Sequence, residues 1–247
     1  MSSGPLSFER YLEDLSTEAG RLAAVTGEAL ERAVPSCPEW TGRDLVEHVW
    51  HVYTFWLAQV LAANATAPLE LGDRAMPAEG EPAEWLEQAA DELAEALRAA
   101  GPEAPCWNWS GRDATTGWLA RRMALESAIH RYDGELTAAD PTPIEPRLSA
   151  DGIDEFLSVH LRTDLPEVPT ATLGGSLCLA SSDTDDAWTV EIGGGRLRVR
   201  NDRGPASAYL RGPVSDLFLF VWNRVAIDAL ELTGDRAVAA AWSSLPH

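Results

Sequence analysis

The 247-residue chain contains no lysine, because all nineteen of its basic residues are arginine. This absence excludes an enzyme that forms a Schiff base through lysine and a nucleotide-binding loop that holds phosphate with lysine. Cysteine is scarce too. Three widely spaced cysteines, none in a C-x-x-C zinc pair, suit a reducing compartment better than a disulfide framework. They are Cys37, Cys106 and Cys178.

Long apolar runs are also missing. No stretch approaches the roughly 20 residues needed to cross a bilayer, and the start of the chain lacks the basic and apolar regions of a signal peptide. Acidic residues outnumber basic ones by 39 to 19, giving a formal net charge of −20. This surplus argues against a nucleic-acid partner, because phosphate binding needs clustered cations. We expect a soluble, cytoplasmic protein, and the sequence leaves open whether it is a monomer or a dimer.

The first half of the chain has the apolar spacing of amphipathic helices. Thr41 and Asp44 have the spacing of a capping box that opens one of them, and Pro82 fits the first turn of another. A fifth helix over 152–161, capped by Asp151, is expected to follow four long ones. The four long helices are predicted over about 7–33, 41–62, 82–101 and 118–130.

From about residue 170 the pattern changes, because short segments rich in β-branched residues replace the helical spacing. Three glycines at 193–195 predict a hairpin turn between two of these segments. The fold class expected is α+β with two domains: a helical bundle over 1–166 and a small α+β domain over 167–247 with a mainly antiparallel sheet. The strands are predicted at 170–181, 187–192, 196–200, 208–210 and 229–233, with helices at 213–222 and 237–242.

Glu126 and His130 are the most informative pair in the sequence. They lie four residues apart in a predicted helix, so both side chains share one face and could bind the same metal ion. A third ligand would come from another helix, either His48 or His51 one turn further on. The spacing alone also fits a solvated helix face, and His48 also fits a buried core histidine.

Two segments around these residues resemble the signatures of the mycothiol-dependent maleylpyruvate isomerase family, a branch of the DinB-like four-helix proteins. They are Cys37–His48 and Arg121–Asp133. Two later segments, 151–157 and 212–217, resemble the C-terminal part of that family, so the resemblance covers nearly the whole chain.

By position, the resemblance implies that His48, Glu126 and His130 bind a divalent metal, usually zinc. The chain departs from the family at Leu125, where members often have histidine, and at Tyr132, where they often have tryptophan. Neither change removes a ligand, but both leave the lining of the pocket undefined.

The resemblance also implies a function. Mycothiol would be the thiol cosubstrate, and the metal would activate its thiolate to attack a small electrophile, by cis-trans isomerisation of maleylpyruvate or by S-transfer. Two alternatives stay open: a non-catalytic metal-binding, ligand-binding or regulatory protein on the same scaffold, and a metal-dependent hydrolase that activates water.

Three further positions could belong to the site. Arg122, four residues before Glu126, could hold a substrate carboxylate or simply pair with Glu126. Asp133 could orient the second ring nitrogen of His130 or lie at the surface. Cys37 could approach the metal or be a structural thiol, and the aromatic loop 107–109 could wall the pocket or pack against neighbours.

Overall fold

The computed structural model describes residues 4–25, 27–70, 77, 81–164, 175–193 and 196–242. Contacts divide the chain into two compact units. One consists of residues 6–142, and the other combines described residues 4–5 with the described residues from Pro143 onward. The boundary expected between residues 166 and 167 lies outside the described residues.

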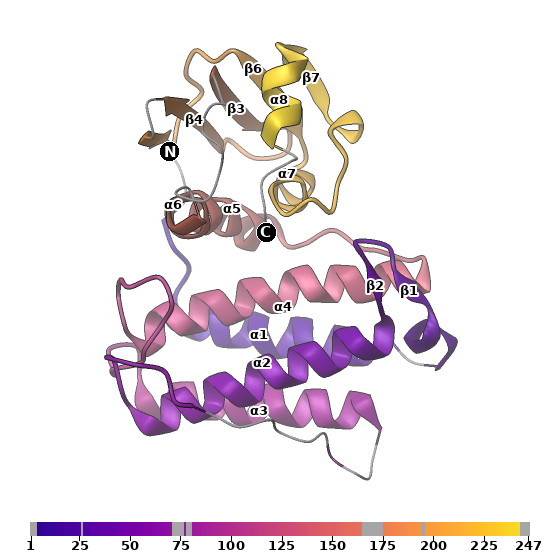
Figure 1. The fold of residues 1–247 in the computed structure, drawn as a ribbon, viewed down its shortest axis with the longest axis vertical. Helices are drawn as coiled ribbons and strands as arrows, with labels where there is room; N and C mark the ends of the chain where they lie inside the picture. Colours follow the sequence, from indigo (N-terminus) through magenta and orange to yellow (C-terminus); the bar gives the residue numbers. More distant parts are fainter. Residues whose placement is uncertain are drawn as a thin grey trace. The chain divides into compact units, whose positions relative to one another are not determined.

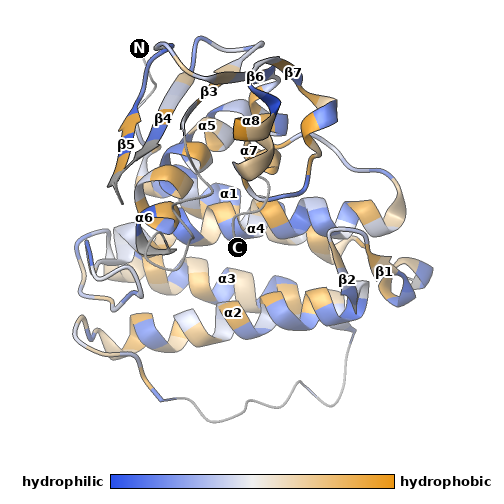
Figure 2. Cartoon of the chain, turned by 45° about the horizontal axis from the view of Figure 1, so that its top comes forward, coloured by the Kyte–Doolittle hydropathy of each residue, from blue (hydrophilic) through white to orange (hydrophobic). Residues whose placement is uncertain are grey.

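Four long helices form the first unit, α1 to α4 (Figure 1). α1 and α2 each pack against both α3 and α4, which closes the helices into a four-membered ring around one core. Figure 2 shows hydrophobic and hydrophilic residues mixed along each helix, as expected of amphipathic elements. The helical domain that the resemblance implied is therefore present. The bounds are α1 (Phe8–Ala23), α2 (Gly42–Ala62), α3 (Pro82–Ala100) and α4 (Thr116–Ala138).

The helix that carries His48 begins at the predicted capping box. The Thr41 hydroxyl accepts a hydrogen bond from the Asp44 N–H at 3.2 Å, and the Thr41 N–H donates to the Asp44 carboxylate at 2.8 Å. These bonds satisfy backbone groups that a helix start leaves without partners. Pro82 occupies the first turn of α3, also as predicted.

The first helix is shorter than predicted, because α1 ends at Ala23 rather than near residue 33. A 3₁₀ turn, η1 (Gly27–Glu31), and a two-stranded hairpin follow it, built from β1 (Ala33–Val34) and β2 (Cys37–Thr41). Apolar residues after Ala23 are still buried, although they lie between α1 and the turn, in the turn and in the hairpin rather than in a helix. They include Val25, Leu30 and Val34.

The second unit begins with α5 (Pro146–Glu155), a π-helical turn η2 (Phe156–His160) and α6 (Leu161–Asp164). The prediction that Asp151 caps this helix is wrong: Glu145 caps it by accepting the Leu148 N–H at 2.9 Å, and Pro146 fills the first turn. α5 packs against α7 (Val214–Val221), where Gly152 leaves room for the Phe218 ring. This helix therefore belongs to the second unit and not to the bundle.

A five-stranded sheet in the order β5-β4-β3-β6-β7 forms the rest of the second unit. It is mixed and not the mainly antiparallel sheet that we expected, because β3 and β6 run parallel. The predicted strand start at 170–174 and the turn at 194–195 lie outside the described residues. The bounds are β3 (Gly175–Ser181), β4 (Ala187–Gly193), β5 (Arg196–Arg200), β6 (Ala208–Gly212) and β7 (Glu231–Gly234), with η3 (Ile227–Ala229) and α8 (Arg236–Trp242).

The connection from β5 to β6 explains the parallel pair. It crosses β4, where the Thr189 hydroxyl donates to the Asp202 carbonyl at 2.8 Å and accepts from the Gly204 N–H at 2.9 Å. The chain thus reaches the free edge of β3 without reversing direction. Strand propensity identified these strands, but it contains no information on which neighbour each one joins.

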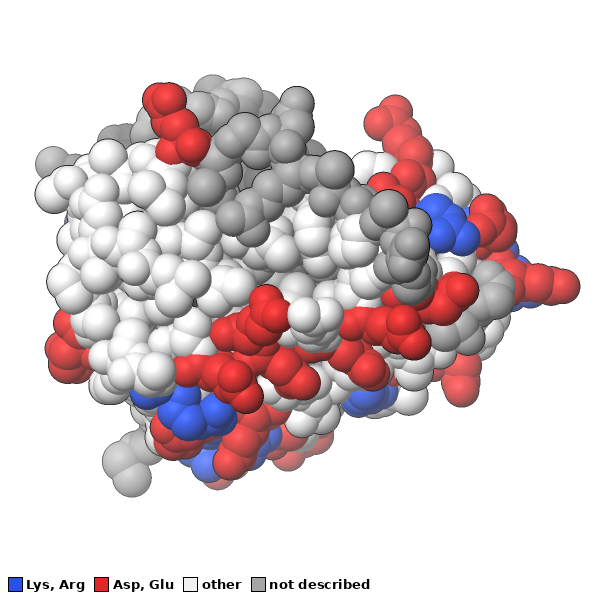
Figure 3. All heavy atoms as spheres, turned by 90° about the horizontal axis from the view of Figure 1, so that it is seen from below, with Lys and Arg blue, Asp and Glu red and all other residues white. Residues whose placement is uncertain are grey.

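Acidic side chains cover much of the face drawn in Figure 3. The outer positions of α3 contribute to the charge, whereas its apolar positions face the core. Among the helices of the described residues, none combines the length and apolar character that a membrane crossing requires. The exposed acids of α3 are Glu84, Glu87, Asp91, Glu92 and Glu95.

Candidate metal centre

α2 and α4 bring three potential metal ligands together. Glu126 Oε1 lies 3.2 Å from His130 Nε2 and 3.9 Å from His48 Nε2. The three ligand atoms all lie within 4.8 Å of one another. Within the described residues, this is the group of histidine, cysteine and acidic side chains that could hold a metal ion.

The spacing of these atoms fits a small divalent ion. Four ligands at about 2.0–2.1 Å from a tetrahedral zinc stand roughly 3.3–3.5 Å from one another. The Glu126–His130 separation of 3.2 Å is close to this value, and the Glu126–His48 separation of 3.9 Å is longer. His130 is buried, whereas the His48 side chain keeps 36% of its surface exposed. Three candidate ligands with one accessible side could hold an ion that keeps an open coordination position, as catalytic zinc sites do.

Asp133 holds the ring of His130 from the other side. Its Oδ2 lies 3.1 Å from His130 Nδ1, and the Asp133 side chain is fully buried. A carboxylate at Nδ1 fixes a proton there and orients the ring so that Nε2 points toward Glu126 and His48. The structure thus places Asp133 beside the second ring nitrogen of His130 and not at the surface.

Burial and charge act in opposite directions on Glu126 and His130. Burial alone would raise the pKa of Glu126, but the His130 and His48 rings and the Arg122 guanidinium hold that pKa well below its usual range. Burial alone would lower the pKa of His130, yet Glu126 and Asp133 raise it to about 9. A cation bound here would compete with this proton, so metal binding should release it.

Residues 13–134 match the family model described as the mycothiol maleylpyruvate isomerase N-terminal domain. The chain belongs to this family. The matched region includes most of the four-helix unit and all three candidate ligands, His48, Glu126 and His130. A comparison with curated proteins found no match.

Two other residues that the sequence suggested for the site, His51 and Arg122, differ in position. His51 is exposed and lies against the edge of the Trp50 ring, so the structure brings His48 and not His51 to α4. Arg122 is buried and donates to Glu126 Oε2 at 3.1 Å. This contact is the ion pair that the sequence left open as an alternative.

The aromatic loop before α4 is held in one conformation by Asn108. Its side-chain amide donates to two loop carbonyls, and its oxygen accepts the Ser110 N–H at 3.0 Å. The rings on either side pack against the helices: Trp107 stacks on Trp56 and Trp109 meets the edge of Trp118. These contacts correspond to the packing alternative.

Two residues of the β1–β2 hairpin reach this site and were not identified from the sequence. The Trp40 ring lies with its centroid 4.8 Å from that of His48, and the Ser36 hydroxyl donates to Asp133 Oδ1 at 2.5 Å. The only sequence signal for Trp40 was its place within the 37–48 signature, and Ser36 directly precedes that signature. Cys37 lies half-buried between them in the chain, outside the metal-ligand group.

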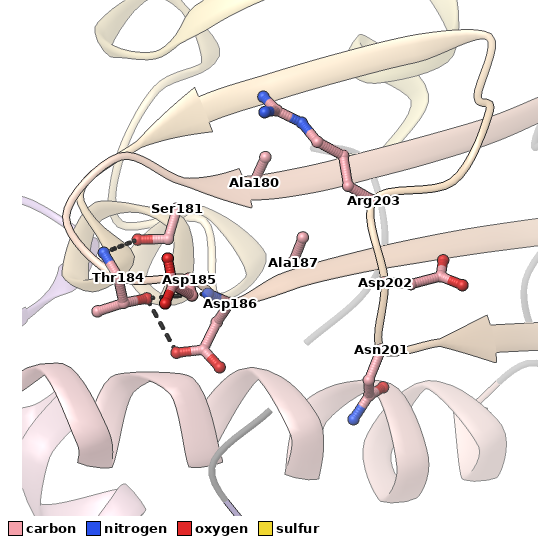
Figure 4. Close-up of a pocket in the computed structure, with 9 residues that line it drawn as sticks. All are labelled: Ala180, Ser181, Thr184, Asp185, Asp186, Ala187, Asn201, Asp202 and Arg203. Carbon is pink, nitrogen blue, oxygen red and sulfur yellow. Dashed lines mark hydrogen bonds between the residues drawn. The ribbon is translucent and has the colours of Figure 1, made fainter. Parts of the chain in front are cut away.

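A polar cavity of about 350 Å³ lies in the second unit, between the β3–β4 turn and the connection after β5 (Figure 4). Hydrogen bonds within its wall join Thr184 to Ser181 and to Asp186. The acidic residues Asp185, Asp186 and Asp202 line it together with Arg203. Within the described residues, they do not form a metal-ligand group like that of His48, Glu126 and His130.

Proposed function

We propose that this chain is a metal-dependent enzyme that uses mycothiol against a small electrophile, either as a maleylpyruvate isomerase or as an S-transferase. The convergence of two imidazole nitrogens and one carboxylate oxygen within 4.8 Å carries the proposal. Membership of the family named for mycothiol and maleylpyruvate supports the choice of thiol and reaction type.

His48, Glu126 and His130 would hold the ion in this proposal, and a donor set of two imidazoles and one carboxylate is typical of catalytic zinc. A bound zinc would lower the pKa of a coordinated thiol, giving a thiolate at neutral pH. The His48 side chain is partly exposed, so a thiol can reach the ion from that side. Because the nucleophile is brought by the cosubstrate, no cysteine of this chain is required.

Arg122 and Asp133 would support the three ligands. Arg122 fixes Glu126 through the oxygen that does not face the histidines, since it contacts Oε2 while both rings face Oε1. Its positive charge beside the ligand carboxylate would also favour an anionic electrophile such as maleylpyruvate. Asp133 would keep His130 in the tautomer that binds metal.

Metal analysis of the purified protein tests the first part of the proposal. We expect about one divalent ion per chain, and loss of that ion in His48→Ala, Glu126→Ala and His130→Ala variants. His51→Ala is the matched control, because it removes a neighbouring exposed histidine outside the group. A folded wild type that takes up no zinc would remove the metal centre from the proposal.

Mass spectrometry of products after incubation with mycothiol and maleylpyruvate tests the second part. Isomerisation returns the thiol after rotation about the single bond of the adduct, whereas S-transfer consumes it. Bound metal with no product from any electrophile would favour a non-catalytic protein. Turnover without added thiol would favour a metal-dependent hydrolase.

A further inference from the structure

The β1–β2 hairpin precedes α2 and packs against α4, the two helices that carry the candidate ligands. Its strands pair from Ala33 with Thr41 to Val34 with Cys37, which leaves a two-residue turn of Pro35 and Ser36. The end of the hairpin continues directly into α2. The turn lies close to α4, because Ser36 contacts Asp133.

Several contacts hold the hairpin firmly. Gly42 N–H donates to the Arg32 carbonyl at 3.0 Å, and a side chain at Gly42 would come within 2.6 Å of the Ala29 carbonyl. The Arg32 guanidinium donates to the Thr137 carbonyl of α4 at 3.2 Å. Pro35 restricts the backbone of the turn, so the position of Ser36 is largely set before any ligand binds.

Ser36 begins a chain of hydrogen bonds that ends at the ligand His130. Its hydroxyl donates to Asp133 Oδ1 at 2.5 Å, and Asp133 Oδ2 lies 3.1 Å from His130 Nδ1. The two carboxylate oxygens are therefore used in opposite directions, one toward the hairpin and one toward the imidazole. A carboxylate held at one oxygen cannot rotate without giving up that bond.

We propose that Ser36 is a positioning residue of the metal centre, which orients His130 through Asp133. This inference rests on the proposed metal-binding function. Groups that orient ligand histidines change metal affinity about 10–100-fold when they are removed. Since Ser36 acts one hydrogen bond further from the ion than Asp133 does, we expect an effect of about tenfold, at the lower end of that range.

A double-mutant cycle on cobalt binding tests the proposal. The variants are Ser36→Ala, Asp133→Ala and the combination of both, with Ser36→Thr to restore a hydroxyl. Arg32→Met is the matched control, because it removes a hydrogen bond to α4 from the residue before β1 without touching Asp133. The dissociation constant of Co²⁺ is measured by competition with a chromophoric chelator, and its visible absorption reports the ligand geometry.

Ser36→Ala should weaken Co²⁺ binding about tenfold and shift the visible spectrum. The same change should have no further effect in the Asp133→Ala background, because the route to His130 is already broken. Ser36→Thr should bind like the wild type, and Arg32→Met should lower the unfolding temperature but leave affinity unchanged.

Wild-type affinity in Ser36→Ala would overturn the positioning role while leaving the metal centre intact. An equal loss with and without Asp133 would also overturn it, since Ser36 would then act through general stability. A wild type that binds no Co²⁺ would overturn the metal centre and this inference together.

Discussion

Helix α4 carries two polar clusters on different faces, and each is built on a pair of residues four positions apart. One is the candidate metal centre of His48, Glu126 and His130. The other, which we call the arginine network, joins α4 to α1 and to the chain after α4. Its members are Glu18, Arg21, Arg131, Glu135 and Thr142.

Every charge in the arginine network meets an opposite one. Fully buried Arg131 donates to Glu18 at 2.6 Å and to Glu135 at 2.9 Å. Arg21 donates to the second oxygen of Glu135 at 2.6 Å. The Thr142 N–H donates to Glu135 at 2.8 Å, and the Thr142 carbonyl accepts from Arg131 at 2.6 Å.

The arginine network and the candidate metal centre differ in side-chain chemistry and not in spacing. A guanidinium presents only donors and does not lose its proton, so it offers a cation no ligand atom. An imidazole can lose its proton and then supplies a lone pair. The same four-residue spacing therefore gives a structural cross-link in one cluster and a candidate binding site in the other.

Arg131→Met should have the largest effect on folding. It leaves the buried carboxylates of Glu18 and Glu135 without their main cationic partner, and breaking a buried pair in this way costs about 3–5 kcal/mol. Chemical unfolding of the metal-free protein measures the loss. Arg98→Met removes the exposed pair with Glu9 and should cost less than about 1 kcal/mol. Similar losses in both variants would contradict the structural role of the buried network.

Glu135→Gln should have an intermediate effect that depends on pH. Burial alone would raise the pKa of Glu135, but hydrogen bonds from Thr142 and the Arg131 charge hold it below its usual range. At neutral pH, loss of the charged acceptor should cost about 1.5–3 kcal/mol.

The sign follows from the lowered pKa. The carboxylate contributes stability above its unfolded-state pKa of about 4.3 and loses it as the pH falls through the lower folded-state pKa. The difference in unfolding free energy between wild type and Glu135→Gln should therefore shrink between about pH 5 and pH 3. Glu95→Gln, on the exposed face of α3, controls for the loss of one surface carboxylate. A difference that stays constant over this range would show that Glu135 does not act through its charge.

Much of the helical unit could be predicted because its signals are local. The capping box at Thr41 and Asp44 and the proline at the start of α3 depend on neighbours a few residues away. The pairing of Glu126 with His130 also follows from helical geometry. His48 was a candidate third ligand with His51 as the alternative, the resemblance implied His48, and the structure places His48 beside the pair.

Long-range contacts could not be predicted in the same way. Ser36 and Asp133 lie 97 residues apart, and nothing in their local sequence connects them. The parallel pairing of β3 with β6 depends on a connection whose path is fixed by Thr189. Leu30 fits a continued helix and a 3₁₀ turn equally well, because both bury it. Periodicity reports burial, but it does not report which partner a residue meets.

His48→Gln should have the smallest effect on the metal-free fold and should separate the two clusters most clearly. The His48 side chain is 36% exposed, so its replacement should change the unfolding free energy by only about 0.5 kcal/mol. Zinc at 100 times its dissociation constant should stabilise the wild type by about 2.7 kcal/mol, because the ion binds only the folded chain. That increment should disappear in His48→Gln and persist in Arg131→Met, whose metal ligands are unchanged. Equal stabilisation of all three proteins by zinc would show that the ion binds elsewhere.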